Sequence, residues 1–272
     1  MDLFRASLGK LTVIRAFNMI CESASHYNAW HPQGKAHFER KWPKSTRNLD
    51  QFIYGGEIAR DALKKHWFSD VSPHVFISHS HKDEALAMGL AGYLLDIGIE
   101  PFVDSLVWGN SNSLLQSIDN SFCLDDEKKY YIYQSRNYST SHVHMMLASA
   151  LAETIDRADA VIFLNTPNSI EAKSAKNAGD DVTASPWIYH ELVTTKLVRR
   201  QGFGGRDRVR PALEHAFDHA HVEKRVEANL KVLHKPPMDH LVDLTHQSLA
   251  QVKAKQMRGL AALDLLYTLT DP

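Results

Sequence analysis

The sequence predicts an α/β fold in which helices cover both faces of a parallel sheet. Short apolar runs recur along the chain after about residue 73, and segments with helical periodicity separate them. The composition, 44% hydrophobic and 23% charged over 272 residues, is ordinary for a globular protein. Alternation of this kind favours a parallel sheet, because each crossover between parallel strands lays a helix on one face.

Four short apolar runs are the predicted strands. Their length and apolar character suit strands that are buried on both faces. They are His74–Ser80 (HVFISHS), 99–104 (IEPFVD), 158–165 (ADAVIFLN) and 240–245 (HLVDLT).

The predicted helices carry recognisable start and stop residues. The first covers 83–98, where Asp83 is placed to cap the helix and Gly98 to end it. Another covers 185–200, with Ser185 as the cap and Pro186 in the first turn. Further helices are predicted over 145–156, over a histidine-rich segment at 211–233, and from 246 onward.

A domain boundary is predicted at 69–73 (SDVSP), a short polar stretch that ends in proline. Residues 1–72 then form a small, mostly helical N-terminal extension, with helical patterns at 3–24 and 47–67 and a loop between them. Residues 73–272 form the main domain.

The charge, the apolar runs and the cysteine content of the sequence argue against several classes of protein. The net charge of −1 gives no overall basic field for nucleic acid or an anionic membrane. No run approaches the roughly 18 apolar residues that span a bilayer, and the N-terminus lacks the apolar core of a signal peptide. Cys21 and Cys123 form no metal motif and are too few for a disulfide framework. We therefore expect a cytoplasmic protein without nucleic-acid or membrane partners.

Candidate functional residues follow the predicted strands, because parallel sheets place ligands beyond the carboxyl ends of their strands. In sequence order they are His79, Ser80, His81, Lys82, Asp104, Ser105, Asn165 and Thr166.

The segment SPWIYHEL adds a further candidate, because Trp187 and Glu191 stand four residues apart. On a helix this spacing puts both side chains on one face. On spacing alone the simpler interpretation is a buried tryptophan beside a solvated glutamate. Of the five tryptophans, only Trp187 has glutamate at the fourth following position.

The 16 histidines raise the question of a metal site, but no pattern supports one strongly. His190–Glu191 begins like a metalloprotease HExxH motif, yet Thr194 stands where its second histidine belongs. His215 and His219 share one face of a predicted helix, and a solvated face is the simpler interpretation of that pair. His142 and His144 have strand-like spacing, which favours a structural or pocket-lining role over metal binding. The expectation is no bound metal.

Taken together, these segments resemble a bacterial Toll/interleukin receptor (TIR) domain. The resemblance is carried by VFISHSHKDEALAMGLAGYLLDIGIEPFVDS, by ADAVIFLNT and by SPWIYHEL, in that order. It implies a flavodoxin-like parallel sheet over 73–272. Two stretches, near 105–145 and 167–184, depart from the family pattern as insertions and are placed to shape or cover a pocket. The basic residue that many members carry after the first strand is matched only loosely, by Lys82 or His81.

The resemblance implies an enzyme that cleaves the nicotinamide–ribose bond of NAD, an NAD glycohydrolase or ADP-ribosyl cyclase. Glu191 matches the catalytic carboxylate. NAD is then the substrate, and no cofactor is implied. The other expected substrate-binding residues are Ser78, His79, Ser80, Lys82, Asp104 and Trp187. For Trp187 packing is the favoured role, and for Asp104 the orientation of a loop.

The same resemblance implies a setting in antiphage immunity. We expect a homo-oligomer formed through contacts between TIR domains, and a separate effector protein that responds to a nucleotide product. The alternative is a non-catalytic TIR scaffold, which acts only through contacts between such domains.

Overall fold

A five-stranded parallel sheet forms the centre of the protein. The computed structural model describes residues 15–21, 24–41, 53–54, 57–58, 72–105, 111–125, 127, 129–172, 181–198 and 232–270. In spatial order the strands are β5 (Pro101–Val103), β4 (Val75–Ser78), β6 (Ala160–Asn165), β1 (Arg15–Ile20) and β9 (Val242–Leu244). Each neighbouring pair is parallel, as the sequence predicts.

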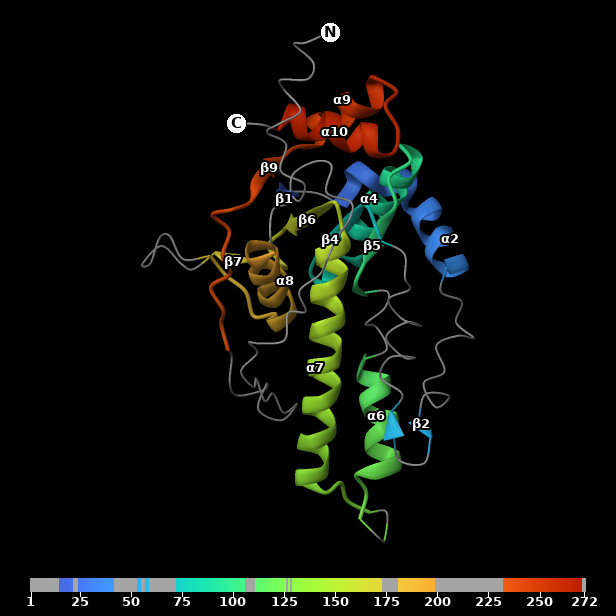
Figure 1. Ribbon diagram of the computed structural model, residues 1–272, viewed down its shortest axis with the longest axis vertical. Helices are drawn as coiled ribbons and strands as arrows, with labels where there is room; N and C mark the ends of the chain where they lie inside the picture. Colours follow the sequence, from blue (N-terminus) through green and yellow to red (C-terminus); the bar gives the residue numbers. More distant parts are fainter. Residues whose placement is uncertain are drawn as a thin grey trace.

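Helices cover both faces of this sheet (Figure 1). One face carries η1 (Ala24–Trp30), α2 (His31–Lys41), α4 (Glu84–Asp96), α9 (His246–Ala254) and α10 (Leu260–Leu269). The other face carries α6 (Ser111–Phe122), α7 (Tyr133–Arg157) and α8 (Pro186–Leu197). The predicted α/β fold with a flavodoxin-like sheet is confirmed.

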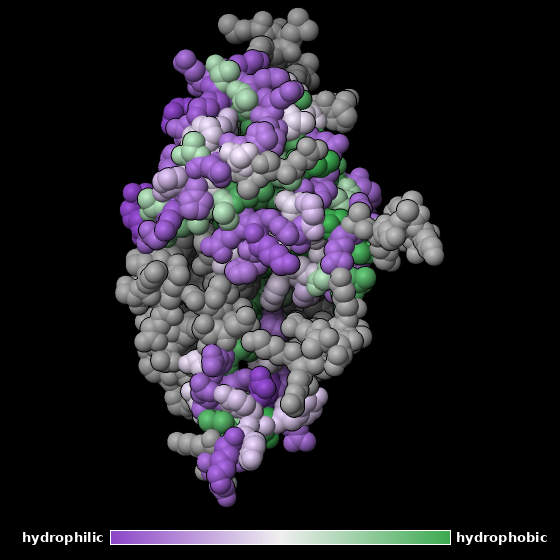
Figure 2. All heavy atoms as spheres, turned by 180° about the vertical axis from the view of Figure 1, so that it is seen from behind, coloured by the Kyte–Doolittle hydropathy of each residue, from purple (hydrophilic) through white to green (hydrophobic). Residues whose placement is uncertain are grey.

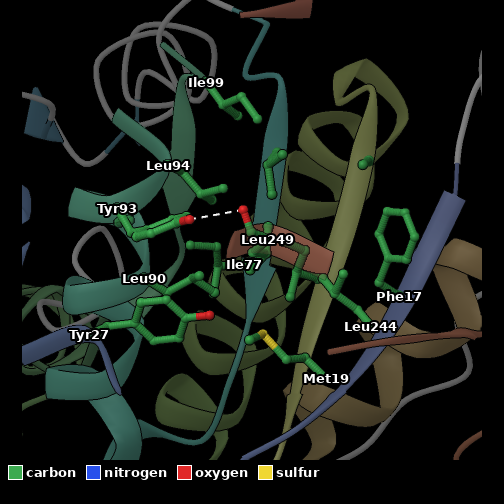
Figure 3. Close-up of a cluster of buried hydrophobic side chains, with 14 of the residues drawn as sticks. Phe17, Met19, Tyr27, Ile77, Leu90, Tyr93, Leu94, Ile99, Leu244 and Leu249 are labelled. Atoms are coloured by element: carbon green, nitrogen blue, oxygen red, sulfur yellow. Dashed lines mark hydrogen bonds between the residues drawn. The ribbon is translucent and has the colours of Figure 1, made fainter. Parts of the chain in front are cut away.

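Alternating side chains of each strand divide between two apolar cores. Val75 and Ile77 of β4 face the α4 side, whereas Phe76 faces the α7 side. The core on the α4 side also holds Phe17 and Met19 of β1 (Figure 3). Within it the Tyr93 hydroxyl donates a hydrogen bond of 2.9 Å to the Leu249 carbonyl, which ties α4 to α9.

The N-terminal segment corrects the predicted domain organisation. Residues 15–20, expected within a helix, form β1, which lies between β6 and β9 inside the main sheet. The expected loop after it contains η1 and α2, both packed on α4. Residues 15–21 and 24–41 are therefore part of the main fold and not a separate extension. Of the second predicted helix, residues 53–54 and 57–58 instead pair as the antiparallel strands β2 and β3; its other residues lie outside the described part.

The strand order has one unusual feature. A flavodoxin-like sheet has the order 2-1-3-4-5. In this protein β4, β5, β6 and β9 correspond to the strands numbered 1, 2, 3 and 5 in that order. The position of strand 4 is filled by β1, which comes before all the others in the chain.

Glycines allow η1 and α2 to approach α4 closely. A Cβ atom added to Gly92 of α4 would lie 2.0 Å from the Trp30 carbonyl oxygen. One added to Gly34 of α2 would lie 2.2 Å from the Met88 carbonyl oxygen. Real Cβ atoms do not come this close to backbone oxygen, so this junction needs residues without a side chain.

The two predicted insertions contain secondary structure of their own. Helix α7 begins at Tyr133, so the predicted helix at 145–156 is only its C-terminal half. With α6 it forms a helical hairpin that extends away from the sheet (Figure 1). In the second insertion, β7 (Glu171–Ala172) pairs with β8 (Asp181–Val182). Within the described ranges, no helix combines the length and apolar character needed to cross a membrane.

Candidate functional site

The side-chain alternation of the strands brings polar groups together at the carboxyl edge of the sheet. Phe76 and Phe102 face α7, so Ser78 and Asp104, two residues further along, turn toward the same side. Helix α8 lies on that side and carries Glu191. Ser185 starts this helix as predicted, because its hydroxyl accepts a hydrogen bond of 3.2 Å from the Ile188 amide.

Glu191 is completely buried at this edge. Its Oε2 atom accepts a short hydrogen bond from the Ser78 hydroxyl. Its Oε1 atom has no hydrogen-bond partner. Asp104 lies close enough that its charge acts on Glu191 and that its carboxylate can accept a hydrogen bond from the protonated glutamate. Within the described ranges, no lysine, arginine or histidine contacts the Glu191 carboxylate.

These surroundings raise the pKa of Glu191 well above its ordinary value. Burial is the largest cause, followed by the negative charge of Asp104. The Ser78 hydrogen bond acts in the opposite direction, since it stabilises the ionised form. Glu191 and Asp104 therefore behave as a carboxyl pair in which a proton on Glu191 is favoured.

His79 supports Asp104 from the other side. Its Nδ1 atom lies 3.1 Å from Asp104 Oδ1, an ion-pair distance without hydrogen-bond geometry, and its Nε2 atom lies 3.0 Å from the Ser105 hydroxyl. Burial lowers the pKa of His79, but the charge of Asp104 and a hydrogen bond with the Ile77 backbone outweigh it, so the pKa is raised overall. The positive charge of His79 is thus directed at Asp104.

The loop after β4 faces a different group of residues. The Ser80 amide donates to the Ser169 hydroxyl at 3.2 Å. Asp83, the predicted helix cap, makes no capping hydrogen bond; its carboxylate accepts from Thr166 and Asn168, beyond the end of β6. This network joins the loops after β4 and β6.

The structure therefore brings together part of the predicted site. Ser78, His79, Asp104 and Glu191 form one cluster, which we call the carboxyl pair site. Lys82 is exposed, and no described contact links it to Glu191. Ser105 and Asn165 also lie at the sheet edge, where Asn165 donates to Asn18 of β1. Asn18 and Ser169 were not predicted. The first lies in a strand mistaken for a helix, and the second in a segment read as an insertion.

Trp187 is half-buried against α7. It packs against the apolar core of α6 and α7, and its ring meets the His144 ring edge-on with centroids 5.8 Å apart. No described contact joins Trp187 to Ser78 or Asp104. These contacts support the packing role for Trp187.

The Trp187→Ala variant is expected to lose about 2 kcal/mol of unfolding free energy, less than the ~3–5 kcal/mol of a fully buried aromatic. Denaturant unfolding measures this loss. Leu197→Ala is the control on the same helix, because Leu197 is 66% exposed and its loss should change stability by under about 0.5 kcal/mol. An unchanged stability for Trp187→Ala would contradict the packing role.

The metal candidates give no cluster. Among the residues that the structure describes, no group of three or more metal-ligating side chains is found. His142 and His144 lie on α7 and not on a strand: His142 is exposed, and His144 faces Trp187. His215 and His219 lie outside the described residues.

Two cavities stand out among the described residues, and neither of them is lined by the carboxyl pair site. One of about 580 Å³ lies between α8 and residues 235–239. The other, of about 700 Å³, lies between α6 and α7. Comparison with protein-family models, with curated proteins and with solved structures finds no match to this chain.

Proposed function

We propose that the protein is an enzyme of the TIR type that cleaves the nicotinamide–ribose bond of NAD at the carboxyl pair site. One observation carries the proposal: Glu191 is fully buried beside a second carboxylate, at the carboxyl edge of a parallel sheet. Burying a carboxyl group in this way is costly for stability. Such costs are concentrated at functional sites, where strongly perturbed pKa values are also found.

The charge of the site suits a cationic substrate. His79 is directed at Asp104, so ionised Glu191 lacks a positive partner among the described residues. The nicotinamide ring of NAD carries a positive charge where it joins the ribose. A bound nicotinamide riboside would supply the missing charge and favour the ionised form of Glu191.

The chemistry of NAD cleavage needs a single carboxylate. Nicotinamide leaves as a neutral pyridine, so the leaving group requires no proton, unlike in most glycosidases. The bond between C1 of the ribose and the ring nitrogen breaks, and its electron pair goes to the nitrogen. Ionised Glu191 then stabilises the positive charge that develops on the ribose and holds the ribose hydroxyls. Water as acceptor gives ADP-ribose, and an internal atom gives a cyclic product.

A purely scaffolding role has no specific observation in its favour. A scaffold would be supported by Glu191 in an ion pair on a flat surface. Glu191 is instead buried and has no basic partner among the described residues.

The direct test is to incubate the purified protein with NAD and to identify the products by chromatography and mass. We expect nicotinamide in equal amount to either ADP-ribose or a cyclic isomer. The Asp239→Asn variant is the control for loss of a carboxylate near α8, because Asp239 is paired with Lys196 at the surface. It should retain full activity. No nicotinamide release at high protein concentration would contradict the proposal.

The pH dependence of the reaction should move in opposite directions in two variants. Activity needs ionised Glu191, so the rate should rise with pH through its raised pKa. Asp104→Asn removes a charge that raises this pKa, so the rising limb should move to lower pH. Ser78→Ala removes a hydrogen bond that lowers it, so the limb should move to higher pH. Rates of nicotinamide release from pH 4 to 9 measure both shifts, and shifts in the same direction would contradict the assignment.

A further inference from the structure

A cavity of about 700 Å³ lies between α6 and α7, outside the carboxyl pair site. Its volume falls within the roughly 300–1,000 Å³ of pockets that hold small organic molecules. Its lining is Ile118, Phe122, Cys123, Gln134, Ser135, Tyr138, Ser139, His142, Val143 and Met146. We call this the hairpin cavity.

The lining of the hairpin cavity defines the chemistry of an occupant. Among the described lining residues none is an aspartate, glutamate, lysine or arginine, so a charged ligand would find no permanent opposite charge among them. Asp119 and Arg136, next in sequence to the lining residues Ile118 and Ser135, are joined to each other by a contact of 2.8 Å. Apolar groups come from both helices, and Gln134, Ser135 and Ser139 of α7 add polar groups. This combination suits an uncharged molecule with an apolar body and a few hydrogen-bonding groups.

Aromatic side chains border the cavity and remain exposed. Phe122 is 44% exposed and Tyr138 is 70% exposed. The Tyr138 ring lies beside the His142 ring, with centroids 4.3 Å apart. The back view shows apolar residues among hydrophilic ones at the lower end of the molecule, where the hairpin lies (Figure 2). Exposed aromatic groups around a cavity are suited to stacking on a planar ring.

Part of the lining of the hairpin cavity belongs to the apolar core that packs against α8, the helix that carries Glu191. Val143 and Met146 line the cavity and belong to the apolar core against which Trp187 of α8 packs. A second contact joins the same helices, because His190 Nε2 lies 3.1 Å from the Ala148 carbonyl oxygen. Trp187 and His190 both lie within four residues of Glu191. A molecule that moves this part of α7 would therefore act on α8.

We propose that the hairpin cavity binds an uncharged, ring-bearing small molecule of about nucleoside size, and that its occupancy is transmitted through α7 to α8. Binding is independent of the function proposed above, whereas transmission rests on it. The effect on NAD cleavage would be a coupling between two sites on one chain.

Binding is tested with two dyes that share one ring system. Phenylnaphthylamine is uncharged, and anilinonaphthalene sulfonate carries an added negative charge; both fluoresce in apolar surroundings. We expect saturable binding of one phenylnaphthylamine per chain, and at least about tenfold weaker binding of the sulfonate. Equal binding of both dyes, or no saturable binding, would overturn the proposed site.

Matched variants place the dye in the cavity. Tyr138→Ala should weaken phenylnaphthylamine binding at least about fivefold, because Tyr138 lines the cavity. Tyr133→Ala is the control, since Tyr133 is 63% exposed on the same helix but does not line the cavity. Ser135→Trp should fill the cavity and abolish binding, and Ser135 is only half-buried, so we expect the helix to tolerate the change. Binding that survives both Tyr138→Ala and Ser135→Trp would overturn the site.

Transmission is tested by the rate of nicotinamide release with and without saturating phenylnaphthylamine. The rate should change at least threefold in the parent protein and remain unchanged in Tyr138→Ala. Binding without any change in rate would overturn transmission alone. If the parent releases no nicotinamide under either condition, transmission falls together with the proposed NAD cleavage, and the dye titrations still decide the site.

Discussion

The Glu191→Gln variant should lose NAD cleavage by at least about 100-fold, the scale of removing one electrostatic group from a buried catalytic site. The amide keeps the shape of the glutamate and can still accept the Ser78 hydrogen bond. It cannot supply the negative charge that stabilises the developing cation on the ribose. The measurement is the rate of nicotinamide release, with Asp239→Asn as the matched control.

The same substitution should make the protein more stable above neutral pH. A raised pKa means that the folded state holds the Glu191 proton more tightly than the unfolded state does. Unfolding free energy contributed by Glu191 therefore falls as pH rises from the ordinary value of 4.5 toward the raised value in the folded protein. The amide has no such titration, so Glu191→Gln should gain about 1–3 kcal/mol over the parent at pH 8.

Denaturant unfolding of the parent and of Glu191→Gln at pH 5 and pH 8 measures this gain. Comparing the two proteins at each pH cancels the contribution of His79, whose raised pKa also makes stability fall with rising pH. A difference that does not grow from pH 5 to pH 8 would show that Glu191 is not held in its protonated form. A gain in stability combined with a loss of activity is the result expected of a functional group.

The Gly92→Ala variant should destabilise the fold by about 1–3 kcal/mol, as expected of overpacking. An added Cβ would lie 2.0 Å from the Trp30 carbonyl oxygen, so η1 or α4 would have to move. Helix propensity alone acts in the opposite direction, because alanine is favoured over glycine by about 1 kcal/mol within a helix.

The sign of the Gly92→Ala effect is therefore decisive. The control is Ala85→Gly, at an exposed position of the same helix, which measures helix propensity without a neighbour. Denaturant unfolding of both variants gives the comparison. A stabilised Gly92→Ala variant would show that the segment around Trp30 does not pack closely on α4.

The sequence predicted most of the sheet because its signals were local. The strands β4, β5, β6 and β9 are short apolar runs followed by polar residues, and each was found. Strand β1 was missed although RAFNMI alternates as a strand does, with Phe17 and Met19 on one side and Asn18 on the other. The reason is that it lies within a longer apolar stretch that also suits a helix. Only its neighbours β6 and β9, far along the chain, determine that it is a strand.

The site was predictable to the extent that it follows from strand ends. His79 and Asp104 were predicted from the rule that parallel sheets gather polar residues at their carboxyl edge, and Ser78 from the family resemblance. Spacing alone had suggested a solvated Glu191, and the structure buries it. Asp83 was assigned as a cap because caps are local, whereas its carboxylate binds Thr166 and Asn168. Sequence neighbours do not reveal such long-range partners.

The position of NAD bound to the Glu191→Gln variant tests the central claim most directly. The variant should bind NAD without cleaving it, so a crystal structure of the complex can show the intact substrate. We predict that the hydroxyls of the nicotinamide ribose lie within hydrogen-bond distance of the amide at position 191, with the positively charged ring beside the carboxyl pair site. NAD bound with its nicotinamide ribose away from Ser78 and position 191 would contradict the account.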